Sequence, residues 1–266
     1  GDDKFRNNVN AAISDDFETN LSFVKYIYEA RLSLKEKEGQ LKDYVLCCNN
    51  INNEECYLCS DDVRYFASES YSGNTTFYEN SRHTWLSDDL MYSLNNKYFN
   101  EFPEEERKQV ESLFRQSFGI KTFTNKSFFS DVVIANKKAL YERLVDKTLL
   151  SDFISYLKRD EEDIFDDSFS FSDIKDLPIL CSNGSVLINR NSYKLIEYDE
   201  SALELANREW CPENIFVIVD KCYSEFQKNT LQCFKIEPFN LSEIMKEILM
   251  SKGFTRITEI DNNNID

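Results

Sequence analysis

Glycine, proline and histidine are scarce in this chain of 266 residues, which contains 6, 4 and 1 of them respectively. The glycines are isolated from one another, so the chain lacks the closely spaced glycines of a P-loop or a dinucleotide-binding fingerprint. Any Ser-His-Asp or Cys-His catalytic arrangement would have to use His83, the single histidine. Because His83 has no counterpart in the internal repeat described below, we interpret it as a solvated loop residue.

Basic residues are also in deficit, with 31 Lys and Arg against 48 Asp and Glu and a formal net charge of −17. Nucleic-acid binding depends on cationic side chains that neutralise phosphates, and anionic membranes attract the same groups. No apolar run approaches the roughly 20 residues that cross a bilayer, and no signal peptide is visible. The sequence therefore predicts neither a nucleic-acid partner nor a membrane partner.

Apolar residues make up 41% of the chain, with 21 Phe and 14 Tyr, which is enough to fill one large core or two ordinary ones. Several of the eight cysteines lie inside apolar, strand-like runs, as at 45–48 and 179–181. Free cysteine behaves as a small hydrophobic residue in such runs. We therefore expect a reducing, cytoplasmic setting.

Two halves of the sequence match each other in the same order. Each has a Phe-x-x-Tyr helix, a strand ending in cysteine, a second hairpin strand, a tryptophan followed by an apolar strand and a tyrosine, and an Ile-x-x-Phe segment before a short helix. The matched pairs are 23–27 with 153–157, 42–47 with 176–181, 57–59 with 186–188, Trp85 with Trp210, Tyr98 with Tyr223, and 120–123 with 236–239, which end in Phe123 and Phe239. This order predicts an internal repeat, and the two tryptophans are interpreted as core residues of their own repeats rather than as ligand anchors.

The repeat predicts an α+β fold of two tandem diverged copies, each a small antiparallel sheet or hairpin packed with helices. The expected parts are an N-terminal extension at 1–14, repeat A at 15–136, repeat B at 137–254 and a flexible acidic tail at 255–266. Asp16 and Asn240 are predicted to cap helices, and Asn183-Gly184 is predicted to form a hairpin turn.

Four cysteines of repeat A are the candidate metal ligands: Cys47, Cys48, Cys56 and Cys59. A structural zinc needs four ligands that converge as a tetrahedron. Adjacent residues of a strand point to opposite faces, so Cys47 and Cys48 cannot easily both bind one ion. The repeat places Cys181 and Ser182 opposite the first pair and Ile188 opposite Cys59, which favours a packing role. We predict no cofactor.

Acidic residues cluster at 160–163 and again at Asp166 and Asp167. Paired carboxylates can bind a divalent cation or support hydrolysis, but the spacing of a calcium loop with its central glycine is missing. We interpret the segment as a solvated linker between helix and hairpin.

The repeated pattern resembles the region downstream of the ATP-binding domain in sacsin-like proteins, large chains with an Hsp90-type ATPase fold that include relatives of the NO VEIN type. The resemblance rests on the Phe-x-x-Tyr-Leu helix at 153–157, the Leu-Pro-Ile-Leu-Cys-Ser-Asn-Gly hairpin at 177–184, and the Trp, strand and Ile-x-x-Phe series that ends at 120–123 and 236–239. It covers most of the chain, but no nucleotide-binding motif of the Hsp90-type domain is present. The resemblance therefore implies a non-catalytic middle segment of a larger ATP-driven chaperone-like or defence-associated protein.

Three functions remain open from the sequence. The first is a non-catalytic scaffold or protein-interaction module that contacts other domains of a longer chain or a partner chain. The second is a zinc-binding or hydrolytic domain centred on the cysteines of repeat A. The third is an extracellular ligand-binding module, which would need an export signal.

Overall fold

The chain forms two compact units, Gly1–Lys137 and Lys138–Asp266. The computed structural model describes residues 2–31, 41–59, 64–66, 79–80, 82–87, 89–165, 169, 174–188, 190–212 and 215–253. Helices and small sheets alternate in both units, so the α+β class is confirmed. The sequence predicts the boundary between the repeats at 136/137, and the structure divides the chain after Lys137. The predicted tail at 255–266 lies outside the described residues.

Unit 1 contains short strands between helices. Its elements are α1 (Asp2–Ile13), α2 (Phe17–Arg31), β1 (Leu46–Asn49), β2 (Glu55–Leu58), β3 (Arg64–Phe66), β4 (Tyr92–Leu94), α5 (Lys97–Asn100), η1 (Glu104–Glu106), α6 (Arg107–Gln116), β5 (Lys121–Thr122), α7 (Asn125–Phe128) and the π-helix η2 (Phe129–Ile134), with α8 (Lys137–Arg143) beginning at its last residue. The five strands form one sheet in the order β2-β1-β4-β3-β5. The hairpin β1–β2 is antiparallel and pairs antiparallel with β4, but β3 pairs parallel with both β4 and β5. The sheet is therefore mixed, whereas the sequence analysis expected an antiparallel one.

The N-terminal residues belong to unit 1 rather than extending from it. The Asn10 side chain of α1 donates to the Asp43 carbonyl at 2.9 Å and accepts from the Val45 backbone N–H at 3.1 Å. Asp16 then caps α2 by accepting from the Thr19 backbone N–H at 2.7 Å, as predicted. The segment at 1–14, expected to be an extension, thus fixes the approach to strand β1.

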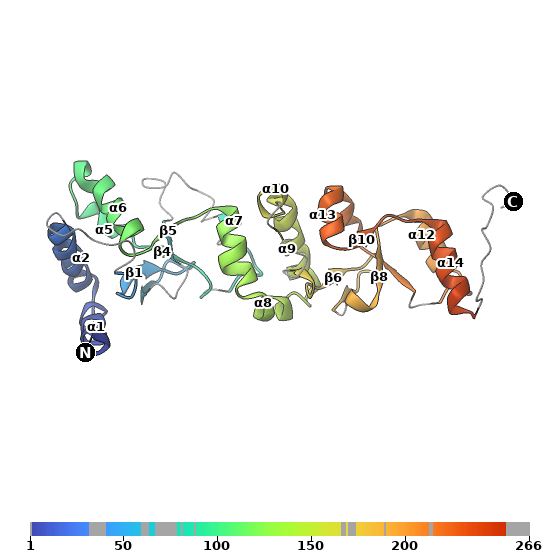
Figure 1. The fold of residues 1–266 in the computed structure, drawn as a ribbon, viewed down its shortest axis with the longest axis horizontal. Helices are drawn as coiled ribbons and strands as arrows, with labels where there is room; N and C mark the ends of the chain where they lie inside the picture. The colour runs from blue at the N-terminus through green and yellow to red at the C-terminus, as the bar shows by residue number, and fades with distance from the viewer. Residues whose placement is uncertain are drawn as a thin grey trace. The chain divides into compact units, whose positions relative to one another are not determined.

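The core of unit 1 lies between the sheet and helices α2, α5 and α6, while α7 lies on the other side (Figure 1). The first side is filled by aliphatic and aromatic residues of these helices, among them Val24, Phe99 and Phe114. On the second side, Phe123 packs against Tyr65 and Phe128 with ring centroids 4.9 and 5.6 Å apart. Both faces of the sheet are therefore covered.

Unit 2 repeats this alternation with shorter strands. Its elements are α9 (Lys147–Arg159), α10 (Glu161–Ile164), β6 (Ile179–Leu180), β7 (Val186–Leu187), η3 (Arg190–Ser192), β8 (Lys194–Ile196), α12 (Glu200–Ala206), β9 (Phe216–Ile218), η4 (Lys221–Glu225), α13 (Lys228–Cys233), β10 (Ile236–Glu237) and α14 (Leu241–Ser251). Asp146 caps α9 and Asn240 caps α14. The hairpin β6–β7 turns at Gly184, whose φ of 78° favours glycine.

The strands of unit 2 are connected in the same order as those of unit 1. The hairpin β6–β7 is antiparallel, an antiparallel bridge between Cys181 and Val219 joins it to the end of β9, and β8 pairs parallel with both β9 and β10. The resulting order, β7-β6-β9-β8-β10, corresponds strand by strand to β2-β1-β4-β3-β5. Such a shared order supports the predicted repeat.

The strand pairing shifts one predicted match by a residue. Cys48 pairs with Leu94 in unit 1, and Cys181 pairs with Val219 in unit 2. Cys181 therefore corresponds to Cys48, and Leu180 to Cys47, whereas the sequence alignment placed Cys181 at Cys47. The match of β2 with β7 is unchanged, because Tyr57 pairs with Cys47 as Val186 pairs with Leu180.

Unit 2 has apolar clusters on both faces of its parallel strands. Helices α12 and α14 cover one face through Ala202, Leu205, Ile244 and Ile248, and α13 lies on the other side (Figure 1). There Phe234 is buried with its ring centroid 5.8 Å from Tyr223 and 5.6 Å from Phe226.

Candidate functional site

Each unit has a buried tyrosine that holds its hairpin strand to the helix after the antiparallel partner strand. The hydroxyl of Tyr98 accepts from the Cys47 backbone N–H at 2.8 Å, and that of Tyr223 accepts from the Leu180 backbone N–H at 3.3 Å. Tyr98 and Tyr223 follow Leu94 and Val219 at the same spacing, and both are fully buried. These two contacts are equivalent in the two units.

Burial determines the protonation of these tyrosines. Desolvation raises the pKa of Tyr98 well above its usual range, and it does the same for Tyr223. In unit 1 the Tyr98 hydroxyl also donates to the side chain of buried Asn20, which in turn donates to the Ile13 and Val45 carbonyls at 2.8 and 3.1 Å. A hydroxyl that stays protonated and bonded in this way stabilises the fold and is a poor general base.

The residue after the antiparallel partner strand has the same role in both units. The Asn95 backbone N–H donates to the Cys47 carbonyl at 3.1 Å, and the Asp220 backbone N–H donates to the Leu180 carbonyl at 2.9 Å. The side chain of each then accepts from the backbone N–H two residues on, at 3.0 Å in Asn95 and 2.9 Å in Asp220. Asn and Asp are interchangeable here because both offer an acceptor to the turn.

The candidate zinc cysteines do not converge. Cys47 and Cys48 are fully buried in β1, Cys56 is partly buried in β2, and Cys59 follows that strand. Cys48 and Cys56 are cross-strand partners, while the Cys47 sulfur lies 3.4 Å from the Asn95 amide nitrogen. Among the described residues, no group of three or more His, Cys, Asp or Glu is arranged to hold a metal ion.

The buried thiols are also poorly suited to act as nucleophiles or ligands. Desolvation raises the pKa of Cys47 in unit 1 and the pKa of Cys181 in unit 2. Burial, together with the nearby Asp220 carboxylate, raises the pKa of Cys222 to about 12. Because the thiolate is the reactive form, these cysteines behave as packing residues at neutral pH.

The two matched tryptophans have different surroundings. Trp85 is fully buried, with its ring centroid 4.9 Å from His83 and 6.0 Å from Phe128. Trp210 is 45% exposed, and the Lys252 ammonium lies 5.9 Å from its ring centroid. The predicted core role is therefore wrong for Trp210, and His83 stacks on a buried indole rather than lying free in solvent.

Phe123 and Phe239, the remaining matched pair, also differ in how deeply they are buried. Phe123 is fully buried, whereas Phe239 is partly exposed and packs against the cluster of α12 and α14.

The acidic segment at 160–163 is only partly a solvated linker, which corrects the sequence interpretation. Asp160 and Glu161 are 8% and 5% exposed. Glu161 accepts from the Gln227 backbone N–H at 2.7 Å and pairs with Lys158 at 2.8 Å. Burial alone would raise the pKa of Glu161, but bonds from Lys158, Thr230 and Gln227 together lower it. Glu161 thereby caps the start of α13 from α10. Asp166 and Asp167 lie outside the described residues.

An open cleft of about 270 Å³ lies over the segment just described, lined by residues 158–163 and Gln227. Its cations are paired with its own carboxylates, Lys158 with Glu161 and Arg159 with Asp160 at 2.7 Å. A ligand would have to break these pairs, and the cleft offers little apolar surface of the kind that small-molecule sites use.

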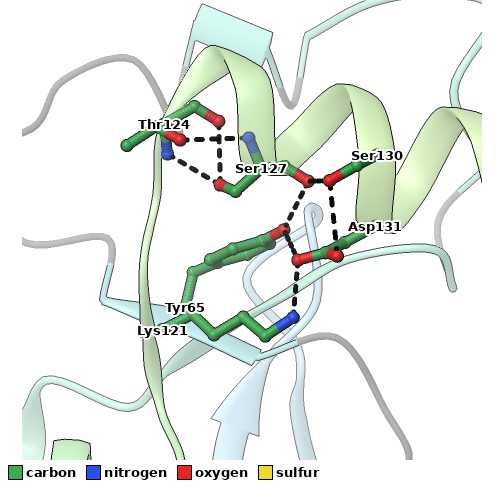
Figure 2. A network of polar contacts seen from close by, with 6 residues as sticks. All are labelled: Tyr65, Lys121, Thr124, Ser127, Ser130 and Asp131. Atoms are coloured by element: carbon green, nitrogen blue, oxygen red, sulfur yellow. Dashed lines mark hydrogen bonds and ion pairs between the residues drawn. The ribbon is translucent and has the colours of Figure 1, made fainter. Parts of the chain in front are cut away.

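A polar network in unit 1 joins the π-helix to the edge of the sheet (Figure 2). Lys121 of β5 pairs with Asp131 at 2.6 Å, and the Tyr65 hydroxyl lies 3.4 Å from the same carboxylate and 3.3 Å from the Ser127 carbonyl. Thr124 and Ser127 form a capping box at the start of α7. Burial and then the Asp131 charge raise the pKa of Tyr65, so its hydroxyl remains protonated at neutral pH.

In unit 2, ion pairs also connect the last helix, α14, to the edge of the sheet, but the charged residues differ from those of unit 1. Lys194 of β8 lies 3.2 Å from Glu237 of β10, and 3.7 and 3.0 Å from Glu243 and Glu247 of α14. Glu237 corresponds to Lys121 of unit 1 in the strand pairing. In unit 2 a carboxylate thus replaces the cation of the last strand and the cation stands on the neighbouring strand, while the helix bears carboxylates in both units.

Comparisons with protein-family models, with curated proteins and with solved structures found no match. The resemblance to sacsin-like proteins therefore stays a prediction. None of the helices in the described part of the chain is long and apolar enough to cross a membrane.

Sequence reasoning misread Glu161 as part of a solvated linker, and it missed Lys194 and the Tyr65 network. Glu161 reaches Gln227 across 66 residues of chain, and no local pattern signals such a bond. Glu243 and Glu247 do carry a signal, since their spacing places both on one side of a helix.

Proposed function

We propose that this chain is a non-catalytic protein-interaction module made of two diverged copies of one α+β unit. One contrast supports the proposal. Tyr98, Tyr223 and Glu161 are held in bonds within their own units, whereas unit 2 exposes large apolar side chains. Trp210 and Leu241 are 45% and 48% exposed. Exposed aromatic side chains are typical of protein contact surfaces.

The two-copy organisation rests on more than the sequence matches. The strand order, the tyrosine contact to the hairpin and the Asn/Asp turn recur at corresponding positions in both units. A left-handed residue also precedes the last strand in each, Gly119 with φ 70° and Lys235 with φ 54°. A non-glycine residue rarely takes this conformation, so its recurrence supports a common backbone plan.

The resemblance extends the proposal to the setting of the chain. We place it as a middle segment of a sacsin-like or NO VEIN-like protein whose Hsp90-type ATPase domain lies elsewhere in the sequence. Its partners are then other domains of that longer chain or a partner protein in the cytoplasm, and nucleic acid is not among them. The short hairpin motif at 177–184 is the sequence that bears most on this placement.

Two measurements on the purified full chain test the function. Size-exclusion chromatography with the Hsp90-type domain encoded in the same reading frame should show co-elution, while elemental analysis should find less than a tenth of a zinc ion per chain. Failure to associate with any domain of that reading frame would count against the interaction role. Zinc near one equivalent per chain would replace it with a metal-binding role for the cysteines of unit 1.

A further inference from the structure

Helix α14 of unit 2 has an apolar line that its own core leaves partly uncovered. Ile244 and Ile248 are buried, but Met245 and Leu249 beside them remain partly exposed and Leu241 is 48% exposed. The spacing of 241, 245 and 249 keeps these side chains on one side of the helix. Trp210 lies near the C-terminal end of this line, since the ammonium of Lys252, three residues after Leu249, lies 5.9 Å from its ring centroid. We call Leu241, Met245, Leu249 and Trp210 the α14 strip.

The corresponding surface of unit 1 is closed within the chain. Trp85 is fully buried, and on the corresponding helix Phe129 and Val133 are 5% and 0% exposed. The apolar character of this place is thus common to both units, while among the described residues only unit 1 covers it. An uncovered surface of a kind that is buried elsewhere in the same fold is suited to a protein partner.

Charge at the strip indicates which partner. Lys194 draws Glu243 and Glu247 of α14 toward the sheet, whereas Lys246 and Lys252 are exposed and Lys252 lies beside Trp210. Within the part of the chain that the structure describes, neither of these two lysines forms an ion pair. In a chain with a net charge of −17 this is a local basic rim. It complements carboxylates on a partner. In a symmetric pair of copies the strip would face itself and bring lysines beside lysines, which opposes a second copy of this chain as the occupant.

We propose that the α14 strip binds an amphipathic helix of a partner protein, with the partner's apolar face on the strip and its carboxylates beside Lys246 and Lys252. This inference rests on the proposed interaction function and names the surface that performs it. The 11 residues of α14 give a line about 16 Å long, or three helical turns, which suits side-by-side helix packing. Trp210 is the anchor, because a half-exposed indole gains the most from being covered.

Two synthetic helical peptides of about 18 residues test the inference on the full chain. Both have the same leucine face, and their flanking positions are all Glu in one and all Lys in the other. We expect the Glu-flanked peptide to shift Trp210 emission to the blue in a saturable titration, at least tenfold tighter than the Lys-flanked peptide. Leu249→Ser should weaken that binding at least tenfold, and the double variant Lys246→Glu, Lys252→Glu should reverse the preference between the peptides.

Met250→Ser is the matched control, since Met250 is 59% exposed on the opposite side of α14 and should bind both peptides as the unchanged chain does. No saturable binding of the Glu-flanked peptide, or equal binding of the two, overturns the inference. Concentration-dependent dimerisation that Leu249→Ser abolishes would assign the strip to a second copy instead. Trp210 emission already shielded from iodide in the free chain would mean that the chain covers the strip itself. In each of these cases, continued co-elution with an Hsp90-type domain would leave the proposed function standing, because that contact would use another surface.

Discussion

Trp85 and Trp210 precede Leu94 and Val219 at the same spacing along the chain, yet one is fully buried and the other is 45% exposed. The strand order and the tyrosine contact to the hairpin are nevertheless shared between the two units. The comparison teaches that a few main-chain contacts define this unit and that the residue at a matched position can serve either the interior or the surface. Sequence identity at one position is therefore weak evidence of a common environment.

A second contrast concerns the last helix of each unit. Unit 1 fastens it with one cation on the strand and one carboxylate on the helix, and unit 2 uses one cation among three carboxylates. The connection persists although the charges differ, since opposite charges stabilise it in either arrangement. Three pairs of substitutions and one single variant test this comparison of the two units.

The largest difference is expected between Trp85→Ala and Trp210→Ala. Removing the fully buried indole of Trp85 should lower the free energy of unfolding of unit 1 by about 3–5 kcal/mol, while the half-exposed Trp210 should cost under about 1 kcal/mol in unit 2. Amide hydrogen exchange, read separately for the residues of each unit, measures both effects. Equal losses in the two units would contradict the difference in their environments.

The tyrosine contacts should follow, with Tyr98→Phe more costly than Tyr223→Phe. The first variant leaves the buried Cys47 N–H and the Asn20 side chain without their shared partner, and the second removes one longer bond to Leu180. We expect losses of about 2 and 1 kcal/mol respectively, measured by urea denaturation with exchange readout in each unit. Tyr26→Phe is the control: Tyr26 is 68% exposed, so this variant should leave the free energy of unfolding unchanged.

Glu161→Gln should destabilise unit 2 alone, by about 1–2 kcal/mol, because it removes the charge from a buried cap and from the pair with Lys158. Since the folded-state pKa of Glu161 lies below its ordinary value of 4.5, its contribution is present above that pH and is lost as the pH falls through the lowered pKa. The stability of unit 2 should therefore fall below about pH 4.5 in the unchanged chain and fall less steeply in the variant. Parallel pH profiles would argue against this cap.

The smallest difference is expected between Lys194→Met and Lys121→Met. Lys121 is itself 54% exposed and the carboxylate partners of Lys194 are at least 41% exposed, so each change should cost under about 1 kcal/mol. The loss should be larger for Lys194 because three carboxylates then repel one another. Added salt should reduce the difference in stability loss between the two variants, because it screens that repulsion. Hydrogen exchange of the α14 amides at two ionic strengths measures the salt effect on the Lys194 variant. A loss that grows with salt would exclude electrostatic repulsion as its cause.

The fold class and most local elements followed from the sequence because their signals are local. Asp16, Asn240 and the Asn183-Gly184 turn act within a few residues, and each is found where predicted. The parallel pairings of β3 and β8 were missed because two- and three-residue strands have no periodicity to read. The one-residue shift at Cys181 arose because neighbouring apolar residues of a strand look alike in sequence, and only the bridge to Val219 identifies the partner.

The candidate site was less predictable, since its residues meet through folding. The exposure of Trp210 depends on what covers it, and a single sequence holds no record of that cover. Glu161 was interpreted as solvated because acidic runs usually are, and its burial depends on α13 arriving more than sixty residues later. The outer apolar line of α14 was visible as a helical spacing, but sequence alone could not tell whether it faced a core.

The π-helix at Phe129–Ile134 offers a physical reason for the closed surface of unit 1. A π-helix has more residues per turn than an α-helix. Side chains four residues apart therefore fall short of a full turn in the π-helix, whereas they pass beyond a full turn in the α-helix α14 of unit 2. Val133 is consequently rotated back toward the interior, while Leu249, at the matching place on α14, is left turned partly outward. A change in helical phase therefore turns the side chain at this place without any change in the strands that carry the helix.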